Sequence, residues 1–303
     1  MMDAVERYLR LRRLTGFAMS NAEYLLASFA RFAAERDETL IRAQTAIDWA
    51  AQGPSAAQRD ARLKAVCRFA RHVCAEDDRH ELPPANYFGW RKKRRLPYIY
   101  AKGEIDRLIE AAAQLRPRGA LRPHTYATLL ALLASTGLRI SEALGLRFAD
   151  ITADGLLIRE TKFRKTRLVP LHDSAAAGLE RYLMRRRQHA SDDDHVFIGE
   201  HGRPLSYPAV QGTFLTLLRR AGPWSTPGGH RPRLHDLRHA FAVRALQASP
   251  AGRRRIGQHM TALATYLGHV NIYATYWYLE AAPELLQDIA DVGETFMDRG
   301  AQS

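Results

Sequence analysis

Apolar side chains recur at short helical spacings in separate stretches of the first 82 residues, with polar residues on the opposite faces. This apolar stripe consists of Leu9, Leu14, Tyr24, Leu25, Phe29, Phe32, Leu63, Val66, Phe69, Ala70 and Val73. Such spacing is typical of amphipathic helices that bury one face. Ser20 or Asn21 is placed to cap the second helix, and the Gly-Pro-Ser segment at residues 53–55 separates the third from the fourth. The pattern predicts a helical domain over residues 1–86.

A proline-rich break and a run of basic residues follow this helical part. Pro83 and Pro84 form the break, and Pro97 closes the basic run. The basic residues are Arg91, Lys92, Lys93, Arg94 and Arg95. We interpret residues 87–98 as an interdomain linker whose cationic side chains lie near DNA phosphates. A solvated run of charges without a partner is the alternative interpretation.

The second part of the chain, residues 99–303, shows a mixed pattern. Helices are predicted around residues 104–114 and 126–135. Two short segments, residues 156–161 and 167–171, are rich in apolar residues and are joined by a polar stretch. They predict a β-hairpin with a long loop. Because most of the remaining sequence is again helical in pattern, we expect a mainly α-helical protein with a small β-sheet.

The charge of the chain narrows its partners. Lys and Arg total 45 against 32 Asp and Glu, which gives a formal net charge of +13. This excess favours a polyanionic partner such as nucleic acid, although a basic protein without such a role remains possible on charge alone. No run of about 18 apolar residues occurs, and the start of the chain lacks the apolar core of a signal peptide. We therefore expect a cytoplasmic protein without a membrane partner.

The two cysteines, Cys67 and Cys74, lie seven residues apart on a predicted helix. That separation corresponds to about 10 Å along the helix axis, which is beyond disulfide reach. We expect buried thiols in a reducing compartment. His72 and His80 lie nearby, so zinc is an alternative, but the spacing matches no common ligand pattern.

The segment from Ser135 to Leu146 predicts a tight turn between two helices. Gly137 can adopt the left-handed conformation that ends a helix, and Ser141 can cap the next one. Glu142 then lies in the positive first turn. This arrangement holds Arg139 on a rigid turn, which suits an anion-binding guanidinium, although an isolated arginine there is more often a surface residue.

His235 and Arg238 are three residues apart and are predicted to share one face of a helix. Together they can hold one phosphate, the arginine through a fork of hydrogen bonds and the histidine through a hydrogen bond or proton transfer. A structural pair is the plain alternative. Zinc is another, since His235 and His239 have the spacing of helical metal ligands, but Asp236 replaces the usual glutamate and no third ligand is evident.

A third segment, residues 266–279, contains several tyrosines that could act as nucleophiles. Tyr273, Tyr276 and Tyr278 are the candidates within its second half. Aromatic residues at helical spacing are more often part of a core, so nothing local selects one of them.

Taken together, these segments resemble the tyrosine recombinases of the phage integrase family over about residues 97–290. The family pattern is an arginine in a T-G-L-R-x-S-E-like turn, a hairpin lysine, H-x-x-R, a histidine in L-G-H and a tyrosine nine positions later. The matching residues are Arg139, Lys162, His235, Arg238, His269 and Tyr278, in that order. Lys162 follows from aligning the hairpin, with Arg164 and Lys165 as competing choices and as candidate DNA contacts. Glu142 matches the acidic residue that follows the first arginine and orients it.

The resemblance implies a specific architecture. It implies a helical core-binding domain (a SAM-like four-helix bundle) over residues 1–86, a basic linker over 87–98, and an α+β catalytic domain over 99–303. The two domains would form a C-shaped clamp around duplex DNA. A C-terminal helix at about residues 283–296 would dock on a neighbour in a tetramer that bridges two recombination sites, or on its own domain.

The resemblance also implies a reaction that needs no cofactor, metal or ATP. Arg139 and Arg238 would stabilise the charge on the phosphate, and Tyr278 would attack it to form a 3′-phosphotyrosine. His235 would accept the tyrosine proton, His269 would bond the phosphate, and Lys162 would protonate the leaving 5′ oxygen. Integration, excision or transposition of a mobile element is the expected role.

Three other functions remain as alternatives: a type IB topoisomerase, a catalytically silent DNA-binding protein, and a metal-dependent transposase or nuclease. Two departures from the family pattern bear on the choice. Residues 248–255 form a longer insertion than many relatives have, and residues 279–286 look like the ending of transposon-associated integrases.

Overall fold

The computed structural model describes residues 1–90, 97–101, 103–159, 166–189, 191–224, 231–248 and 256–268. The chain divides into two compact units, Met1–Arg95 and Leu96–Ser303. This division falls within the residues predicted to form the linker. None of the helices in the described ranges has the length and apolar character needed to cross a bilayer.

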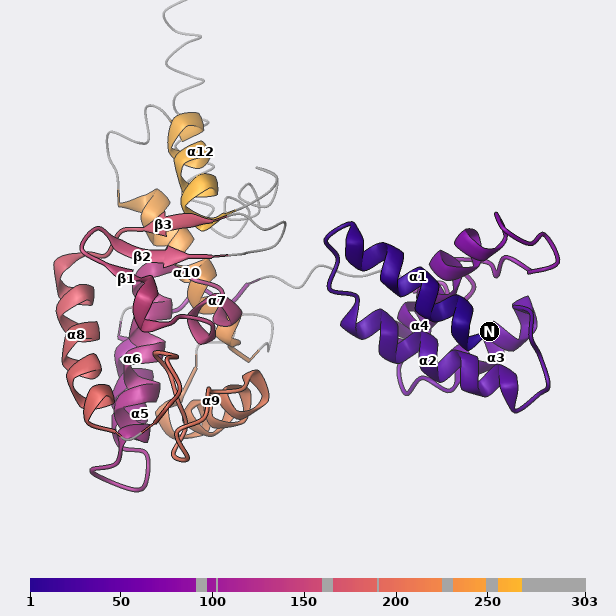
Figure 1. Ribbon diagram of the computed structural model, residues 1–303. Coiled ribbons are helices and arrows are strands. Elements are labelled where there is room, and N and C mark those ends of the chain that lie inside the picture. Colours follow the sequence, from indigo (N-terminus) through magenta and orange to yellow (C-terminus); the bar gives the residue numbers. More distant parts are fainter. Residues whose placement is uncertain are drawn as a thin grey trace, which may run out of the picture. The chain divides into compact units, whose positions relative to one another are not determined.

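Within residues 1–90, the first unit is built from the four helices that the apolar stripe predicts (Figure 1). They are α1 (Met2–Leu14), α2 (Ser20–Ala34), α3 (Ala43–Ala51) and α4 (Ala56–Val73). Phe29 and Trp49 meet edge to face in the core, with ring centroids 5.4 Å apart. Leu63, Val66 and Phe69 of α4 are fully buried against them, as the apolar pattern predicts. Two residues of the predicted stripe are not buried: Leu14 of α1 is 82% exposed and Tyr24 of α2 is 70% exposed.

The caps of this unit agree with the sequence at one helix and differ at another. Ser55 caps α4, where its hydroxyl accepts a hydrogen bond from the backbone N–H of Gln58 at 3.3 Å. The prediction that Ser20 or Asn21 caps α2 is wrong. Ser20 is the first helical residue, and Met19 precedes it in the left-handed conformation without a side-chain cap. A helix can therefore begin where the turn geometry directs it, even when a good capping residue lies one position later.

The cysteines and histidines of the first unit hold a loop in place. Cys67 is buried and its thiol donates to the carbonyl of Pro83, while Cys74 donates to the carbonyl of His80. The Nδ1 atom of His80 accepts the backbone N–H of Ile41 at 2.9 Å. Both thiols are free, and among the described residues these groups form no cluster that could hold a metal.

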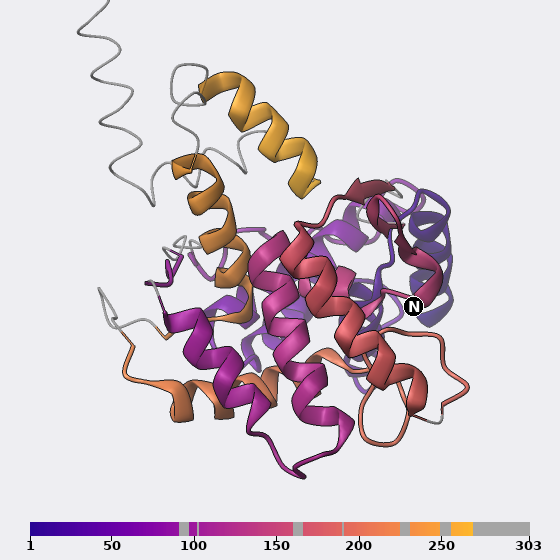
Figure 2. The ribbon, with the colours of Figure 1, turned by 90° about the vertical axis from the view of Figure 1, so that its left-hand side faces the viewer.

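The second unit is organised around α6 (Leu121–Thr136), which lies between α5 (Glu104–Ala113) and α8 (Asp173–Gln188) (Figure 2). Its other described helices are the short α7 (Ile140–Leu144), the 3₁₀ turn η1 (Phe148–Asp150), α9 (Tyr207–Ala221), α10 (Leu234–Gln247) and α12 (Ile256–Leu267). Helix α12 packs on α10 through a small apolar cluster and also contacts the sheet. The prediction that α6 begins near residue 126 is wrong by five residues, because Pro123 is tolerated in its first turn.

The predicted hairpin is present, and the sheet has one more strand than expected. Strands β1 (Ile151–Thr152), β2 (Gly155–Ile158) and β3 (Arg167–Val169) are antiparallel in the order β1-β2-β3. Ile158 pairs with Arg167, so the start of β3 lies at one end of the sheet. A glycine is required at position 155, the first residue of β2, because its φ is +133° and an added Cβ would lie 2.3 Å from the carbonyl oxygen of Val169.

Candidate active site

The turn that carries Arg139 is built by Gly137 and Glu142. Gly137 ends α6 with φ 63° and ψ 19°, in the left-handed conformation that its sequence position predicts. Arg139, and not Ser141, is the residue that precedes α7, so the predicted Ser141 cap is wrong. The carboxylate of Glu142, in the third helical position, accepts the backbone N–H of Arg139 at 2.9 Å. This contact fixes the start of α7 at residue 140 and leaves Ser141 inside the helix.

The guanidinium of Arg139 reaches across to the end of α12. Its Nη1 atom donates to Glu142 at 2.7 Å, and its Nη2 atom donates to the backbone carbonyl of Gly268 at 3.1 Å. The side chain remains 30% exposed. Arg139 is thus held on two sides while its side chain stays partly exposed.

Arg238 is anchored more deeply in the same place. It lies on α10 with only 2% of its surface exposed. Its Nη1 atom donates to the carbonyl of Gly137 at 2.8 Å, and its Nη2 atom donates to the carbonyl of Leu267 at 2.6 Å. Leu267 also accepts from Nη1 of Arg139 at 3.5 Å. The two arginines that the sequence placed in one phosphate site therefore meet at a single backbone carbonyl.

Glu142 and Arg167 form the base of this cluster. Arg167, at the start of β3, grips both carboxylate oxygens of Glu142, at 3.1 Å and 2.8 Å. Burial alone would raise the pKa of Glu142, but hydrogen bonds from Arg167 and Arg139 lower this pKa to about 2. Glu142 is therefore ionised at neutral pH. Arg139 and Arg167 contact this carboxylate, and Arg238 lies beside Arg139 at the carbonyl of Leu267. Because the cluster contains three guanidinium groups and one carboxylate, it keeps a net positive charge that suits a phosphate.

His235 stands at the edge of the cluster, in the first turn of α10. Arg233 precedes this helix, and the carboxylate of Asp236 accepts its backbone N–H at 2.8 Å. The residue is exposed overall, yet its ring lies near the charges of Arg238, Arg233 and Arg139. Partial desolvation, followed by the charge of Arg238, lowers its pKa below the ordinary histidine value. At neutral pH the ring is therefore mainly neutral and able to accept a proton.

The zinc alternative for this helix gains no support. The rings of His235 and His239 meet edge to face with centroids 4.7 Å apart. The carboxylate of Asp236 is already paired with Arg233, whose Nη2 atom donates to it at 2.8 Å. In the part of the chain that the structure describes, no further acidic, cysteine or histidine side chain joins the two rings in a metal-binding group.

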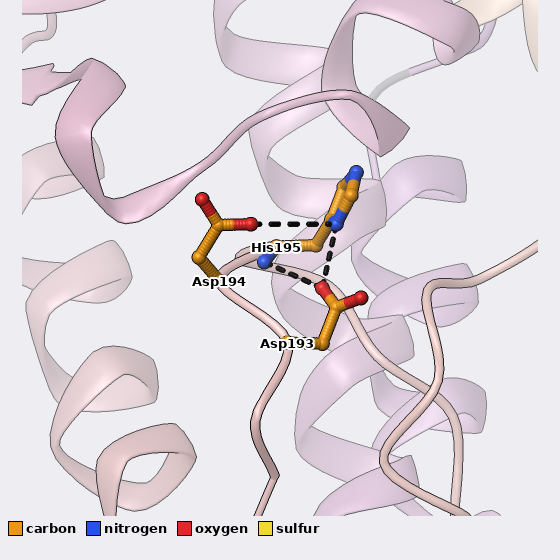
Figure 3. Close-up of side chains that lie close together, drawn as sticks. All are labelled: Asp193, Asp194 and His195. Carbon is orange, nitrogen blue, oxygen red and sulfur yellow. Dashed lines mark hydrogen bonds and ion pairs between the residues drawn. The ribbon is translucent and has the colours of Figure 1, made fainter.

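One other group has the composition of a metal site. Asp193, Asp194 and His195 lie close together on the loop after α8 (Figure 3). Their ligand atoms already have partners: Asp193 accepts from the backbone N and pairs with Nδ1 of His195, at 2.8 Å and 2.6 Å. Asp194 accepts Nη1 of Arg147 at 3.0 Å. We interpret these contacts as fixing the loop.

Several predicted site residues lie outside the described residues. These are the predicted catalytic residues Lys162, His269 and Tyr278, and the predicted DNA contacts Arg91, Lys92, Lys93, Arg94, Arg95, Arg164 and Lys165. The described chain nevertheless reaches two of these segments. Arg167 begins the strand that follows the Lys162 loop, and Gly268 directly precedes His269. Arg167 donates to Glu142, and the carbonyl of Gly268 accepts from Arg139.

Arg167 is the residue that the sequence reasoning missed. It begins the second strand of the predicted hairpin, and the sequence pattern assigns it no role. Its partners Glu142 and Tyr266 lie 25 and 99 positions away, so no nearby residue signals its place in the cluster.

Comparison with known proteins finds relatives over most of the chain. The model of the phage integrase family matches residues 100–284. The y4rB protein of Sinorhizobium fredii, named for an integrase/recombinase, is 40% identical over 94% of this chain and 94% of its own. The tyrosine recombinase XerD of Caulobacter vibrioides is 30% identical over 95% of this chain and 92% of its own.

Solved structures show the same fold at lower identity. The XerH site-specific recombinase bound to a palindromic difH substrate has a TM-score of 0.64 and 19% identity, covering 96% of this chain and 84% of that protein. A lambda integrase tetramer bound to a Holliday junction has a TM-score of 0.59 and 16% identity, covering 89% and 77%.

Proposed function

Because this chain belongs to the phage integrase family and is a site-specific DNA recombinase, we propose that Arg139 and Arg238 hold the scissile phosphate. The observation that carries this proposal is the shared carbonyl of Leu267, to which both guanidinium groups donate. Arg238 is fixed by burial, and the side chain of Arg139 is partly exposed. Two permanently charged groups in rigid positions can stabilise the negative charge that gathers on the non-bridging oxygens as the phosphate reacts.

The proposed reaction transfers the phosphate to a tyrosine and conserves its bond energy. The hydroxyl oxygen of Tyr278 attacks phosphorus, and His235, which is mainly neutral at pH 7, accepts the hydroxyl proton. The bond from phosphorus to the 5′ oxygen breaks, and Lys162 gives that oxygen a proton. The products are a 3′-phosphotyrosine and a free 5′ hydroxyl. Attack by another 5′ hydroxyl reverses the steps and joins a new strand.

His269 is proposed to add a hydrogen bond to the same phosphate. The support is its position in the chain, because the preceding residue, Gly268, accepts a hydrogen bond from Arg139 through its carbonyl. We propose that the cations of the linker, Arg91, Lys92, Lys93, Arg94 and Arg95, together with Arg164 and Lys165, bind the DNA backbone. Their contribution would be independent of sequence and would weaken as salt concentration rises.

We also propose that the chain acts in the cytoplasm on duplex DNA, as a tetramer on paired sites. The solved relatives include XerH bound to difH and a lambda integrase tetramer on a Holliday junction, which support this assembly. A role in moving a mobile element fits the integrase/recombinase name of y4rB and the similarity in fold to the Tn1549 transposon integrase. Relaxation of supercoils without strand exchange is not favoured by these relatives.

A covalent-trapping experiment tests the mechanism. The protein first selects a duplex from a random-sequence pool, and that duplex is then nicked at successive positions to make suicide substrates. In the presence of EDTA, the wild-type protein is expected to form a denaturation-resistant adduct, and Tyr278→Phe is expected to form none. Tyr273→Phe and Tyr276→Phe are the matched controls and should keep the adduct.

The possible outcomes separate the functions. An adduct formed by Tyr278→Phe would mean that another residue is the nucleophile. A tightly bound duplex without an adduct at any nick would favour a DNA-binding protein without catalysis. An adduct accompanied by supercoil relaxation, but never by joining of strands from two duplexes, would favour a topoisomerase.

A further inference from the structure

We propose that Arg167 is a positioning residue that keeps the positive charge of Arg139 available to the phosphate. The proposal rests on the function proposed above. Arg167 begins β3, opposite Ile158 at the end of the sheet, and only 13% of its side chain is exposed. Among the described residues of the proposed reaction, Arg167 reaches Arg139 through Glu142 and through the backbone at the end of α12.

The contacts of Arg167 join three separate elements. Its two terminal nitrogens donate to the two carboxylate oxygens of Glu142 on α7, and its Nε atom donates to the carbonyl of Tyr266 on α12 at 2.9 Å. Only a planar fork with donors on two sides can make all three bonds at once. A lysine in this position could supply the positive charge, but its ammonium group could not donate to all three acceptors at once.

The packing around Arg167 shows that the space is reserved for a guanidinium. Gly268 lies directly against it: a Cβ added to Gly268 would come within 2.8 Å of Nη1 of Arg167. The φ of Gly268 is +65°, a conformation that glycine adopts readily. The backbone that leads into His269 therefore passes over Arg167 at close range.

The electrostatic effect follows from how the two oxygens of Glu142 are shared. Oε2 accepts from Arg167 and from the backbone N–H of Arg139, while Oε1 accepts from Arg167 and from the side chain of Arg139. Arg167 thus neutralises the carboxylate that holds Arg139. Without Arg167, the buried carboxylate would pair with Arg139 alone, cancel its charge and draw its guanidinium away from Gly268.

The test compares Arg167→Gln with wild type and with Arg139→Ala on the selected nicked duplex. At saturating DNA, we expect Arg167→Gln to bind as tightly as wild type but to form the adduct about 100-fold more slowly, the size seen when one transition-state donor is lost. Arg159→Gln is the matched control, because Arg159 pairs with Asp150, another buried carboxylate beside the same sheet. Its adduct rate should equal that of wild type.

A second substitution separates positioning from general damage. Replacing Glu142 by Gln in the Arg167→Gln protein removes the carboxylate that would capture Arg139. The double variant should then regain about tenfold in rate, the equivalent of one charged hydrogen bond returned to the phosphate. A double variant no faster than Arg167→Gln would overturn the proposal, as would a folded Arg167→Gln protein with the wild-type rate.

The same comparison covers two further situations. If Arg167→Gln does not fold, Arg167→Met, which also removes the positive charge, takes its place, with the same expected loss and the same recovery on adding Glu142→Gln. If the wild-type protein forms no adduct, the proposed function fails, and a crystal structure of Arg167→Gln decides this inference separately. Arg139 paired through both of its terminal nitrogens with Glu142 would support it, and an unmoved Arg139 would overturn it.

Discussion

Two turns of the second unit have the same backbone contact but differ in where the arginine side chain goes: the first corner, at Arg139, and the second corner, at Arg147. At Arg139 and at Arg147, the backbone N–H donates to a carboxylate three residues later, Glu142 at 2.9 Å and Asp150 at 3.0 Å. Each acidic residue starts a short helical segment, α7 or η1, by satisfying a donor that the helix itself cannot satisfy. Local sequence is enough to build both corners.

The side chains of Arg139 and Arg147 then point in different directions. Arg147 turns to the surface and pairs with Asp194, where both side chains are more than half exposed. Arg139 turns inward to the end of α12 and donates to Gly268. The difference is that α12 and Arg238 lie beside the first corner. A chemical site thus arises where a common local turn is met by parts of the chain that are distant in sequence.

The largest loss of adduct rate is expected when Arg238, which shares the Leu267 carbonyl with Arg139 beside the first corner, is removed. Arg238→Ala removes the donors to the carbonyls of Gly137 and Leu267, both of which lie in the interior of the site. We expect an adduct rate at least about 1000-fold lower and unfolding easier by a few kcal/mol, since buried acceptors lose their partners. Trapping on the nicked duplex and thermal unfolding measure the two effects.

The control for this prediction is Arg238→Lys. It keeps the charge but loses the fork, so we expect it to recover part of the stability and little of the rate. If Arg238→Lys cleaved at the wild-type rate, the bidentate geometry at Gly137 and Leu267 would have no part in catalysis.

The next effect concerns Glu142, whose pKa is lowered to about 2 in the folded protein. A carboxyl group with a lowered pKa stabilises the fold above its unfolded pKa, near 4.5, and this contribution is lost as pH falls towards 2. A depression of that size corresponds to roughly 3 kcal/mol. Glu142→Gln should therefore be less stable at pH 7, and its stability should vary less with pH between about 4.5 and 2.

Chemical unfolding of wild type and Glu142→Gln at several pH values checks this prediction. Asp150→Asn tests the other corner in parallel. Because no proposed catalytic residue lies at that corner, its adduct rate should match wild type even if the protein is less stable. Equal acid sensitivity of wild type and Glu142→Gln would contradict the assignment of the lowered pKa to this site.

The sequence predicted the parts of the site that depend on neighbours in the chain. Gly137 ends α6 in the left-handed conformation, and Arg139 lies on the turn that follows. His235 and Arg238 lie one helical turn apart on α10, as their spacing requires. Each of these features needs only a few consecutive residues and the known preferences of glycine, acidic caps and helical periodicity.

The parts that were missed depend on contacts between distant segments. Nothing near Arg167 in sequence indicates Glu142, which lies on another element, or Tyr266, which is 99 positions away. The burial of Arg238 likewise depends on Leu267 at the end of α12. Strand β1 was missed because two residues carry too little pattern, and Gly155 gains its meaning only when Val169 lies beside it.

The smallest effect is expected at the second corner, from Arg147→Gln. Arg147 and Asp194 are 54% and 53% exposed, so water and salt screen their ion pair. Exposed pairs of this kind contribute at most about 1 kcal/mol. The backbone N–H of residue 147 still reaches Asp150 in the variant, which preserves the cap. We therefore expect nearly unchanged thermal unfolding and a wild-type adduct rate, whereas Arg139→Gln, the same substitution at the first corner, should abolish cleavage while the α7 cap persists. Slow cleavage by Arg147→Gln would mean that the loop of Asp193, Asp194 and His195 contributes to the reaction, and the distinction between the two corners would be lost.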